Sequence, residues 1–152
     1  MIVAALALCA CGTSEDPGEI ELTHDACSPL SLVATAPTDA QSAALQGGQQ
    51  LWNDAGVPAL GQAGATIEVR FQSSNPAIRG LYDDKTGVIY INSELKDPRV
   101  LSIVVAHELG HAFGLVHVPQ SERTSLMNPG NIATPPTVED RAALAALWGT
   151  CE

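Results

Sequence analysis

Apolar and polar positions along the first half of the chain predict a strand followed by a helix. The run Leu30–Thr35 is short and apolar, as is typical of a strand. Residues 39–55 carry enough apolar side chains for a first helix packed on a sheet, and Thr38 just before them is a plausible N-cap. Gly47 and Gly48 fall inside this helix and should weaken it by about 1 kcal/mol each.

The middle of the chain predicts three strands. Residues 66–72 alternate apolar and polar side chains, so they form a strand with one buried face. Two further β-rich runs, 78–82 and 88–92, flank a loop that contains aspartates and a glycine. This arrangement is typical of a β-hairpin.

Two more helices are expected in the second half. Asp97 as N-cap and Pro98 at the first helical position predict where the first of them begins. Residues 128–136 are rich in proline and glycine and predict a loop, after which Thr137 caps a last helix. With 152 residues, the chain is expected to form one domain of the α/β (α+β) class.

Three histidines fall in one stretch with the spacing H-E-x-x-H-x-x-G-x-x-H. Residues four apart lie on one face of an α-helix, so His107 and His111 can direct two imidazoles to one point. Neutral imidazole binds Zn²⁺ well, and a hydrolytic zinc site usually has three protein ligands and an open position for water. We therefore expect His107, His111 and His117 to hold one catalytic zinc ion.

Two other residues of the stretch fit this chemistry. Glu108 follows the first ligand and can act as a general base on the water. Gly114 lies where the helix must end, because glycine adopts positive φ without steric cost and can turn the chain back toward His117. The alternative is a buried helix with incidental histidines, which gives no reason for these residue types at these offsets.

The stretch resembles the zinc helix of the metzincin metalloendopeptidases. The segment Ser125–Pro129 is similar to the Met-turn of that family, and the end of the chain, through Trp148-Gly149, is similar to the last helix of its matrixin branch. The resemblance implies a twisted mixed sheet with an antiparallel edge strand, two long helices and a C-terminal helix. It also implies that Met127 forms the hydrophobic floor of the site without binding the metal.

The same resemblance implies how a substrate is bound. It places residues 78–82 along the active cleft, where an extended peptide can add to the sheet as another strand. It makes residues 128–136 the wall of a pocket for the residue after the scissile bond, and Ile132 indicates a modest apolar pocket. Matrixin loops near Asp83 and Asp84 sometimes bind Ca²⁺, although two adjacent acids are also ordinary turn formers.

The N-terminal residues indicate export. Residues 1–10 are apolar but too few to span a bilayer, which is typical of a signal peptide. The sequence Leu8-Cys-Ala-Cys11 resembles a bacterial lipobox, which implies lipidation of Cys11; an ordinary secretory peptide is the alternative. Residues 11–26 are polar, acidic and without periodicity, so we expect a flexible tether there and the catalytic domain over 27–152.

Cysteine counting predicts one disulfide. Loss of Cys9 with the signal and lipidation of Cys11 would leave Cys27 and Cys151, an even pair in an oxidising compartment. A bridge between them would close nearly the whole domain and, on the chain-entropy model, stabilise it by up to about 4–5 kcal/mol.

Two alternatives concern latency. Cys27 could instead be a thiolate that blocks the metal in a latent form. His24 and Asp25 could also cap the metal from the N-terminal side, although both fit equally well as solvated tether residues.

Charge and motif together define the expected function. Seventeen acidic and seven basic residues give a net charge of −10, which argues against nucleic-acid binding and fits neutral or cationic peptides near the cleft. We expect a monomeric zinc endopeptidase that acts on extended peptide or protein substrates. It would be exported, as a bacterial cell-surface or outer-membrane lipoprotein or in secreted form, and would meet the membrane only through its lipid anchor. The alternatives are a catalytically silent zinc-binding surface or adhesion module and a hydrolase of a non-peptide amide.

Overall fold

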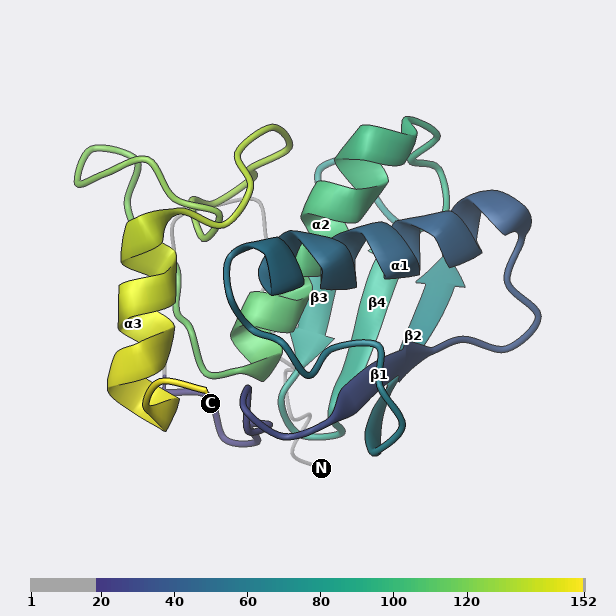
Figure 1. Ribbon diagram of the computed structural model, residues 1–152. Coiled ribbons are helices and arrows are strands. Elements are labelled where there is room, and N and C mark those ends of the chain that lie inside the picture. The colour runs from purple at the N-terminus through teal and green to yellow at the C-terminus, as the bar shows by residue number, and fades with distance from the viewer. Residues whose placement is uncertain (1–18, 152) are drawn as a thin grey trace, which may run out of the picture.

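The computed structural model describes residues 19–151 and has the mixed α/β architecture expected from the sequence (Figure 1). The predicted signal peptide over residues 1–10 and Cys11, the predicted lipidation site, lie outside the described residues. Along the chain the elements are β1 (Leu30–Val33), α1 (Asp39–Asp54), β2 (Ala65–Gln72), β3 (Gly80–Asp83), β4 (Val88–Asn92), α2 (Pro98–Ala112) and α3 (Val138–Trp148).

The four strands form one mixed sheet in the order β1-β2-β4-β3. Strand β1 is parallel to β2, and β2 is parallel to β4. A parallel pair needs a crossover connection, which α1 supplies between β1 and β2. Strand β3 pairs with β4 in the antiparallel sense and is the edge strand, so the predicted hairpin and antiparallel edge are confirmed.

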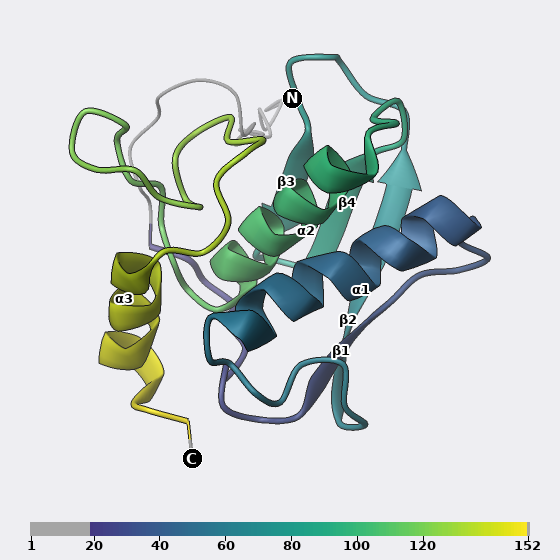
Figure 2. The ribbon, with the colours of Figure 1, turned by 45° about the horizontal axis from the view of Figure 1, so that its top comes forward.

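Helices α1 and α2 cross each other on one face of the sheet (Figures 1 and 2). Gly47 and Gly48, which we expected only to weaken α1, lie at this crossing. A Cβ on Gly48 would come within 2.4 Å of Val105 Cγ1, and one on Gly47 within 2.3 Å of Ser102 Oγ. These glycines destabilise α1 by their low helix propensity, and the close packing of α2 that they allow offsets this loss.

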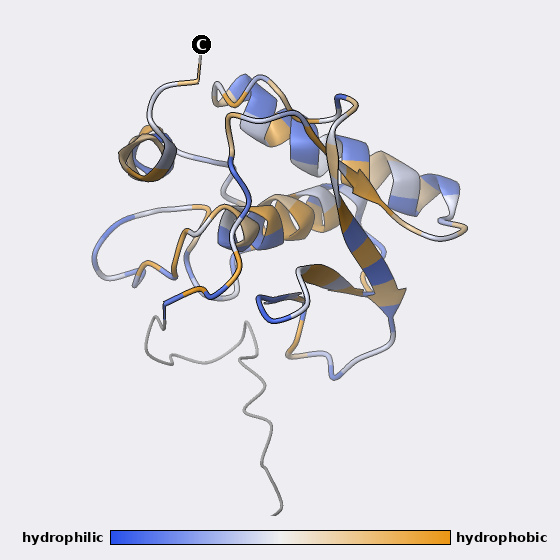
Figure 3. Ribbon diagram, turned by 90° about the horizontal axis from the view of Figure 1, so that it is seen from below, coloured by the Kyte–Doolittle hydropathy of each residue, from blue (hydrophilic) through white to orange (hydrophobic). Residues whose placement is uncertain are grey.

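The core lies between this helical layer and the sheet. Ile67 and Val69 of β2 are buried, whereas Glu68 and Arg70 point to the opposite, exposed face. Figure 3 shows such alternation as bands of hydrophilic and hydrophobic colour along a strand. Trp52 of α1 is fully buried, and its Nε1 donates a hydrogen bond to the Ala106 carbonyl of α2 at 2.9 Å. Within residues 19–151, none of the helices has the length and apolar character needed to cross a membrane.

The segment before β1 differs from the expected tether. From residue 19 onward it lies along the domain: Tyr82 Oη donates a hydrogen bond to the Leu22 carbonyl at 3.0 Å, and the His24 amide donates to the Ala112 carbonyl at 2.7 Å. Because its backbone groups find partners on β3 and α2, the polar composition of residues 19–26 does not keep them apart from the domain.

Cys27 and Cys151 form the predicted disulfide, with their Cα atoms 4.9 Å apart and 124 positions apart in the sequence. The bridge joins the segment before β1 to the residues that follow α3. Trp148, at the end of α3, donates a hydrogen bond from Nε1 to the Phe113 carbonyl at 2.8 Å, so the same corner is also tied to the end of α2. With its sulfur bonded to Cys151, Cys27 is not the metal-blocking thiolate considered above.

Candidate metal centre

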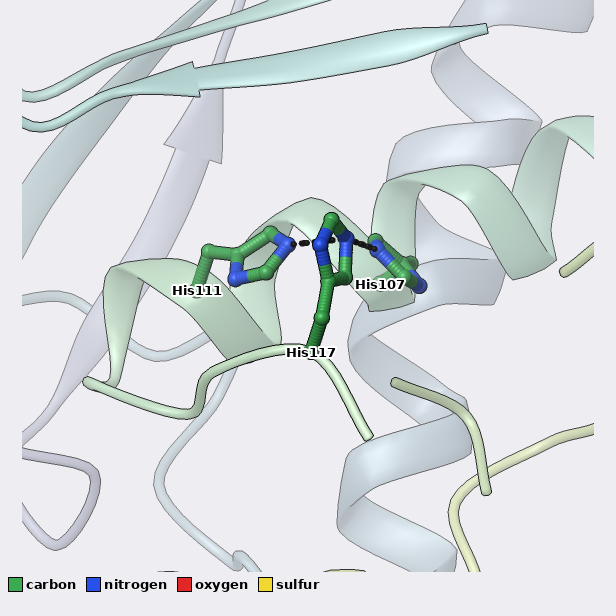
Figure 4. A group of neighbouring side chains, drawn as sticks. All are labelled: His107, His111 and His117. Carbon is green, nitrogen blue, oxygen red and sulfur yellow. Dashed lines mark hydrogen bonds between the residues drawn. The ribbon is translucent and has the colours of Figure 1, made fainter. Parts of the chain in front are cut away.

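Three imidazoles converge beside α2 (Figure 4). His107 and His111 come from the helix and His117 from the segment after it. The Nε2 atom of His117 lies 3.2 Å from that of His107 and 3.2 Å from that of His111. A tetrahedral ion with metal–nitrogen bonds of about 2.0–2.1 Å separates its ligand nitrogens by about 3.3–3.4 Å. The three side chains can therefore hold one metal ion, as the spacing predicted.

Backbone carbonyls fix the orientation of the two helical imidazoles. His107 Nδ1 is 2.7 Å from the Leu126 carbonyl oxygen, and His111 Nδ1 is 2.8 Å from that of Leu115. Because a carbonyl oxygen can only accept, each Nδ1 carries the proton and donates it, and each Nε2 keeps its lone pair. These are the tautomers that a metal ion requires.

Burial keeps the imidazoles neutral. Desolvation lowers the pKa of His107 to about 4, even though its hydrogen bond to Leu126 acts in the opposite direction. Burial also lowers the pKa of His111 well below its ordinary value, and that of His117 to a lesser degree. Since a metal ion competes with protons for the same lone pairs, these shifts favour metal binding near neutral pH.

The helix ends at the predicted glycine. Gly114 has a φ of +94°, a conformation that residues with a side chain rarely adopt. Its amide donates to the His111 carbonyl at 2.8 Å, and the Leu115 amide donates to the Gly110 carbonyl at 3.0 Å, which together form a Schellman motif. This turn brings His117 back to the helix.

A buried carboxylate on α3 organises the segment that contains Met127. Asp140 is completely buried and accepts hydrogen bonds from Ser125 Oγ, from the Leu126 amide at 2.8 Å and from Arg123 Nη1 at 2.8 Å. Burial alone would raise the pKa of Asp140, but these hydrogen bonds and one from the Thr137 amide hold it below its ordinary value. Asp140 is therefore ionised and fully engaged.

This carboxylate acts on the metal centre through one residue. The Leu126 amide donates a hydrogen bond to Asp140, and the carbonyl of the same residue accepts one from His107. The only signal for Asp140 in the sequence is its position three residues after Thr137, where it completes a capping box. That signal predicts a helix start and gives no indication of the link to His107.

Met127 is completely buried against α2. A Cβ on Gly110 would come within 2.6 Å of Met127 Sδ, so the methionine packs on the helical residue that precedes His111. The Met127 amide donates to Ser125 Oγ at 2.9 Å, which ties it to the network around Asp140. The methionine thus lies beneath the part of α2 that carries the helical imidazoles.

Glu108 lies against the edge strand. It is buried, and a Cβ on Gly80, the first residue of β3, would come within 2.5 Å of its Oε1 atom. Gly80 therefore leaves the space that the carboxylate occupies. A glycine inside a strand generally marks a close approach of this kind, but the sequence does not tell which residue approaches.

A small recess opens beside Glu108. Its walls are formed by one face of α2, by the residue before β3 and by the loop after Met127, and they consist of Arg79, Val104, His107, Glu108, Gly130 and Asn131. Arg79 Nη1 donates to the Gly130 carbonyl at 2.9 Å. Ile132, from which a modest apolar pocket was predicted, does not line this recess and is exposed.

The two N-terminal candidates for capping the metal lie elsewhere. The ring of His24 packs edge-on to Tyr82, with the centroids 6.5 Å apart. Asp25 accepts hydrogen bonds from the Cys27 amide and from Ser28 Oγ, both at 2.8 Å. Within the described residues, the group of side chains that could hold a metal ion includes neither of them.

The acidic pair considered for Ca²⁺ has local partners. Asp83 accepts from the Lys85 amide at 3.0 Å and from Thr86 Oγ1 at 2.7 Å, which is how an aspartate stabilises a turn. Asp84 accepts from the Glu21 amide at 2.8 Å and so helps to hold the N-terminal segment. In residues 19–151 this pair does not belong to a group of three or more possible metal ligands.

The centre therefore combines three neutral imidazoles with a buried carboxylate next to one of them. Such a set can bind a divalent metal ion and hold a proton acceptor beside it. No family model matches the chain, and none of the curated proteins matches it either.

Proposed function

We propose that this protein is a zinc-dependent endopeptidase of the kind that the metzincins represent. The observation that carries the proposal is the position of Glu108, which is buried next to the ligand His107 and against the edge strand at Gly80. A structural zinc site normally has four protein ligands and no use for such a carboxylate. Within residues 19–151, the group that could hold a metal has three members.

In this proposal His107, His111 and His117 hold the metal through their Nε2 atoms. When bound, Zn²⁺ would act as a Lewis acid that acidifies a water molecule and polarises the scissile carbonyl group. Glu108 would accept the proton of the attacking water on a carboxylate oxygen and pass it to the nitrogen of the leaving amine. The hydrogen bonds from His107 and His111 to backbone carbonyls would keep two of the rings aimed throughout.

The edge strand favours a polypeptide substrate. One side of β3 pairs with β4, and its other side is the edge of the sheet. An extended peptide can add to such an edge through main-chain hydrogen bonds. Because Gly80 brings this edge against Glu108, a peptide bound there would pass close to the carboxylate. This geometry supports a peptidase over a hydrolase of small amides, and the disulfide supports action in an oxidising compartment.

Substitution of Glu108 tests the proposal most directly. We expect zinc-loaded wild-type protein to hydrolyse peptides, to lose activity on chelation and to regain it with added zinc. Glu108→Ala should still bind one zinc ion while kcat/KM falls by at least about 10²-fold, the lower range for a positioned general base. His117→Ala should lose the metal itself, because it removes a ligand.

A matched control is Glu122→Ala, which removes an exposed glutamate and should change neither activity nor zinc content. Equal peptidase activity in Glu108→Ala and wild type would show that Glu108 is not the base. A zinc-loaded wild-type protein that cleaves nothing in a broad peptide library would favour the silent zinc-binding surface module.

A further inference from the structure

Arg79 brings a positive charge to the recess beside Glu108. We propose that this guanidinium binds a carboxylate of the substrate, carried by the residue whose nitrogen is the leaving amine. The enzyme would then prefer an aspartate or glutamate directly after the scissile bond. This inference rests on the proposed endopeptidase function and names the substrate class that the site selects.

The position of the recess identifies the side of the substrate that it receives. Its lining includes Glu108 and His107, but neither His111 nor His117. In the proposed reaction Glu108 gives a proton to the leaving nitrogen, so the residue that carries this nitrogen must lie next to Glu108. The side chain of that residue is the one that can enter the recess.

Arg79 is the member of the lining that can adapt to a ligand. A guanidinium has five N–H donors, and the hydrogen bond to the Gly130 carbonyl uses one of them. Asn131, the other polar side chain opposite α2, has both ends engaged: Nδ2 donates to the Leu126 and Thr134 carbonyls, and Oδ1 accepts from the Ala133 and Thr134 amides. Asn131 therefore shapes the wall, while Arg79 can offer a pair of donors to a carboxylate.

The positive charge of Arg79 points to the same ligand. Besides Arg79, one other lining residue is charged, the carboxylate Glu108, whereas Val104, Gly130 and Asn131 are neutral and His107 is a neutral imidazole. A lysine or arginine of the substrate would be repelled by the positive charge of Arg79. A large apolar side chain would have to displace this arginine from Gly130 and leave its charge poorly solvated. A carboxylate avoids both costs when its pairing with Arg79 outweighs the repulsion from Glu108, so Arg79 opposes the preference for cationic peptides expected from the net charge.

The carboxylate could come from two sources. One is an acidic side chain after the scissile bond, and the other is the C-terminal carboxylate of a substrate that ends at this residue. The experiment therefore uses one peptide sequence in which this residue is Glu, Gln, Asp, Asn, Leu or Lys and the chain continues to a C-terminal amide. A second set ends at the same residue as a free acid or as an amide.

With zinc-loaded enzyme, we expect kcat/KM for Glu over Gln, and for Asp over Asn, to be about tenfold or more, since charge-assisted hydrogen bonds are the stronger kind. Arg79→Gln should bring both ratios close to one, and Arg79→Lys should keep part of the preference because it keeps the charge. Arg70→Gln is the matched control: Arg70 is an exposed arginine that pairs with Glu68 on the far face of β2, and its loss should leave the ratios unchanged.

A binding measurement separates recognition from catalysis. Fluorescence anisotropy of labelled Glu and Gln peptides on zinc-loaded Glu108→Ala protein should show tighter binding of the Glu peptide, and adding Arg79→Gln should abolish the difference. Each ratio compares two peptides on one protein sample, so partial misfolding of a variant does not change it. A preference for free acids alone would still support a carboxylate site at Arg79 and would assign the main-chain carboxylate as its ligand.

Two outcomes would overturn the inference in distinguishable ways. If wild type cleaves Glu and Gln peptides, and free acids and amides, equally well, the role of Arg79 is wrong while the proposed peptidase function stands. If zinc-loaded wild type cleaves no peptide in either set or in a broad library, the proposed function fails and the inference fails with it.

Discussion

Helix α2 is held in different ways on its two sides. Toward α1 and the sheet the contacts are apolar, with Val105 packed on Gly48 and Leu109 completely buried. Toward the segments that follow the helix, the contacts that matter are hydrogen bonds, from His107 to Leu126 and from the amide of Leu126 to Asp140. The same helix therefore has one side fixed by packing and another fixed by directional bonds.

This difference teaches which interactions do what at the metal centre. Apolar packing is strong but not directional, so it determines where α2 lies. Hydrogen bonds contribute less net stability each but define angles, so they determine how the imidazoles are aimed. Substitutions on the packed side should therefore change stability alone, whereas substitutions on the hydrogen-bonded side should change stability and metal affinity together.

Among the variants that test the two sides of α2, Asp140→Ala should have the largest effect on stability and zinc affinity. It leaves Arg123 and several buried donors without their acceptor, which typically costs about 3–5 kcal/mol of unfolding free energy. It also loosens Leu126, the acceptor of His107, so the zinc affinity of the folded protein should fall about 10–100-fold. Urea unfolding and competition with a zinc chelator would measure the two effects. The control Glu139→Ala removes the exposed neighbouring acid and should change neither the unfolding free energy nor the zinc affinity by much. Unchanged zinc affinity in Asp140→Ala would show that the hydrogen-bonded side of α2 does not aim His107.

The pH dependence of stability in the metal-free protein should further separate the packed side of α2 from its hydrogen-bonded side. The folded pKa of His107 is about 4, against an ordinary value of 6.5, so its neutral form is the one that stabilises the fold. This stabilisation is fully present above pH 6.5 and decreases as the pH falls. By pH 4 the unfolding free energy should have dropped by about 3 kcal/mol. Urea unfolding in the presence of chelator should show this loss. His107→Gln should make this fall shallower without removing it, because burial also lowers the pKa of His111 and His117. An equally steep fall in that variant would assign the whole loss to other groups.

Gly48→Val should have the smallest effect and should be confined to stability. The added side chain must displace Val105 at the helix crossing, and overpacking of this kind costs about 1–3 kcal/mol. Gln46→Val places the same side chain on the exposed face of α1 and provides the control for helix propensity. Zinc affinity of the folded protein should be unchanged in both variants. A loss of affinity in Gly48→Val would show that packing also aims the imidazoles.

The parts of the molecule that the sequence predicts are those encoded over short distances. The N-caps Thr38, Asp97 and Thr137 all begin helices where expected, because a cap depends on residues within one turn. The convergence of the three histidines and the stop at Gly114 follow from helical geometry in the same way.

The parts that escaped prediction depend on contacts between distant segments. Gly80 makes room for Glu108, and Arg79 reaches Gly130, 51 positions away along the chain. No local spacing encodes such pairs. The N-terminal segment was predicted to be a tether from its composition, but the partners that hold residues 19–26 lie on β3 and α2. The presence of Arg79 in the recess escaped prediction for the same reason, since this residue lies just before β3 and far in the sequence from the loop after Met127.

The disulfide also determines how the protein responds to mechanical force. A pull applied to the chain ends reaches Cys27 from one direction and Cys151 from the other, so the covalent bond carries the load between them. The 124 positions that separate the two cysteines correspond to roughly 400–450 Å of extended chain, none of which can be drawn out while the bond is intact. The metal centre lies entirely within this closed loop. Tension along the chain therefore bypasses the three imidazoles and their hydrogen-bonded supports.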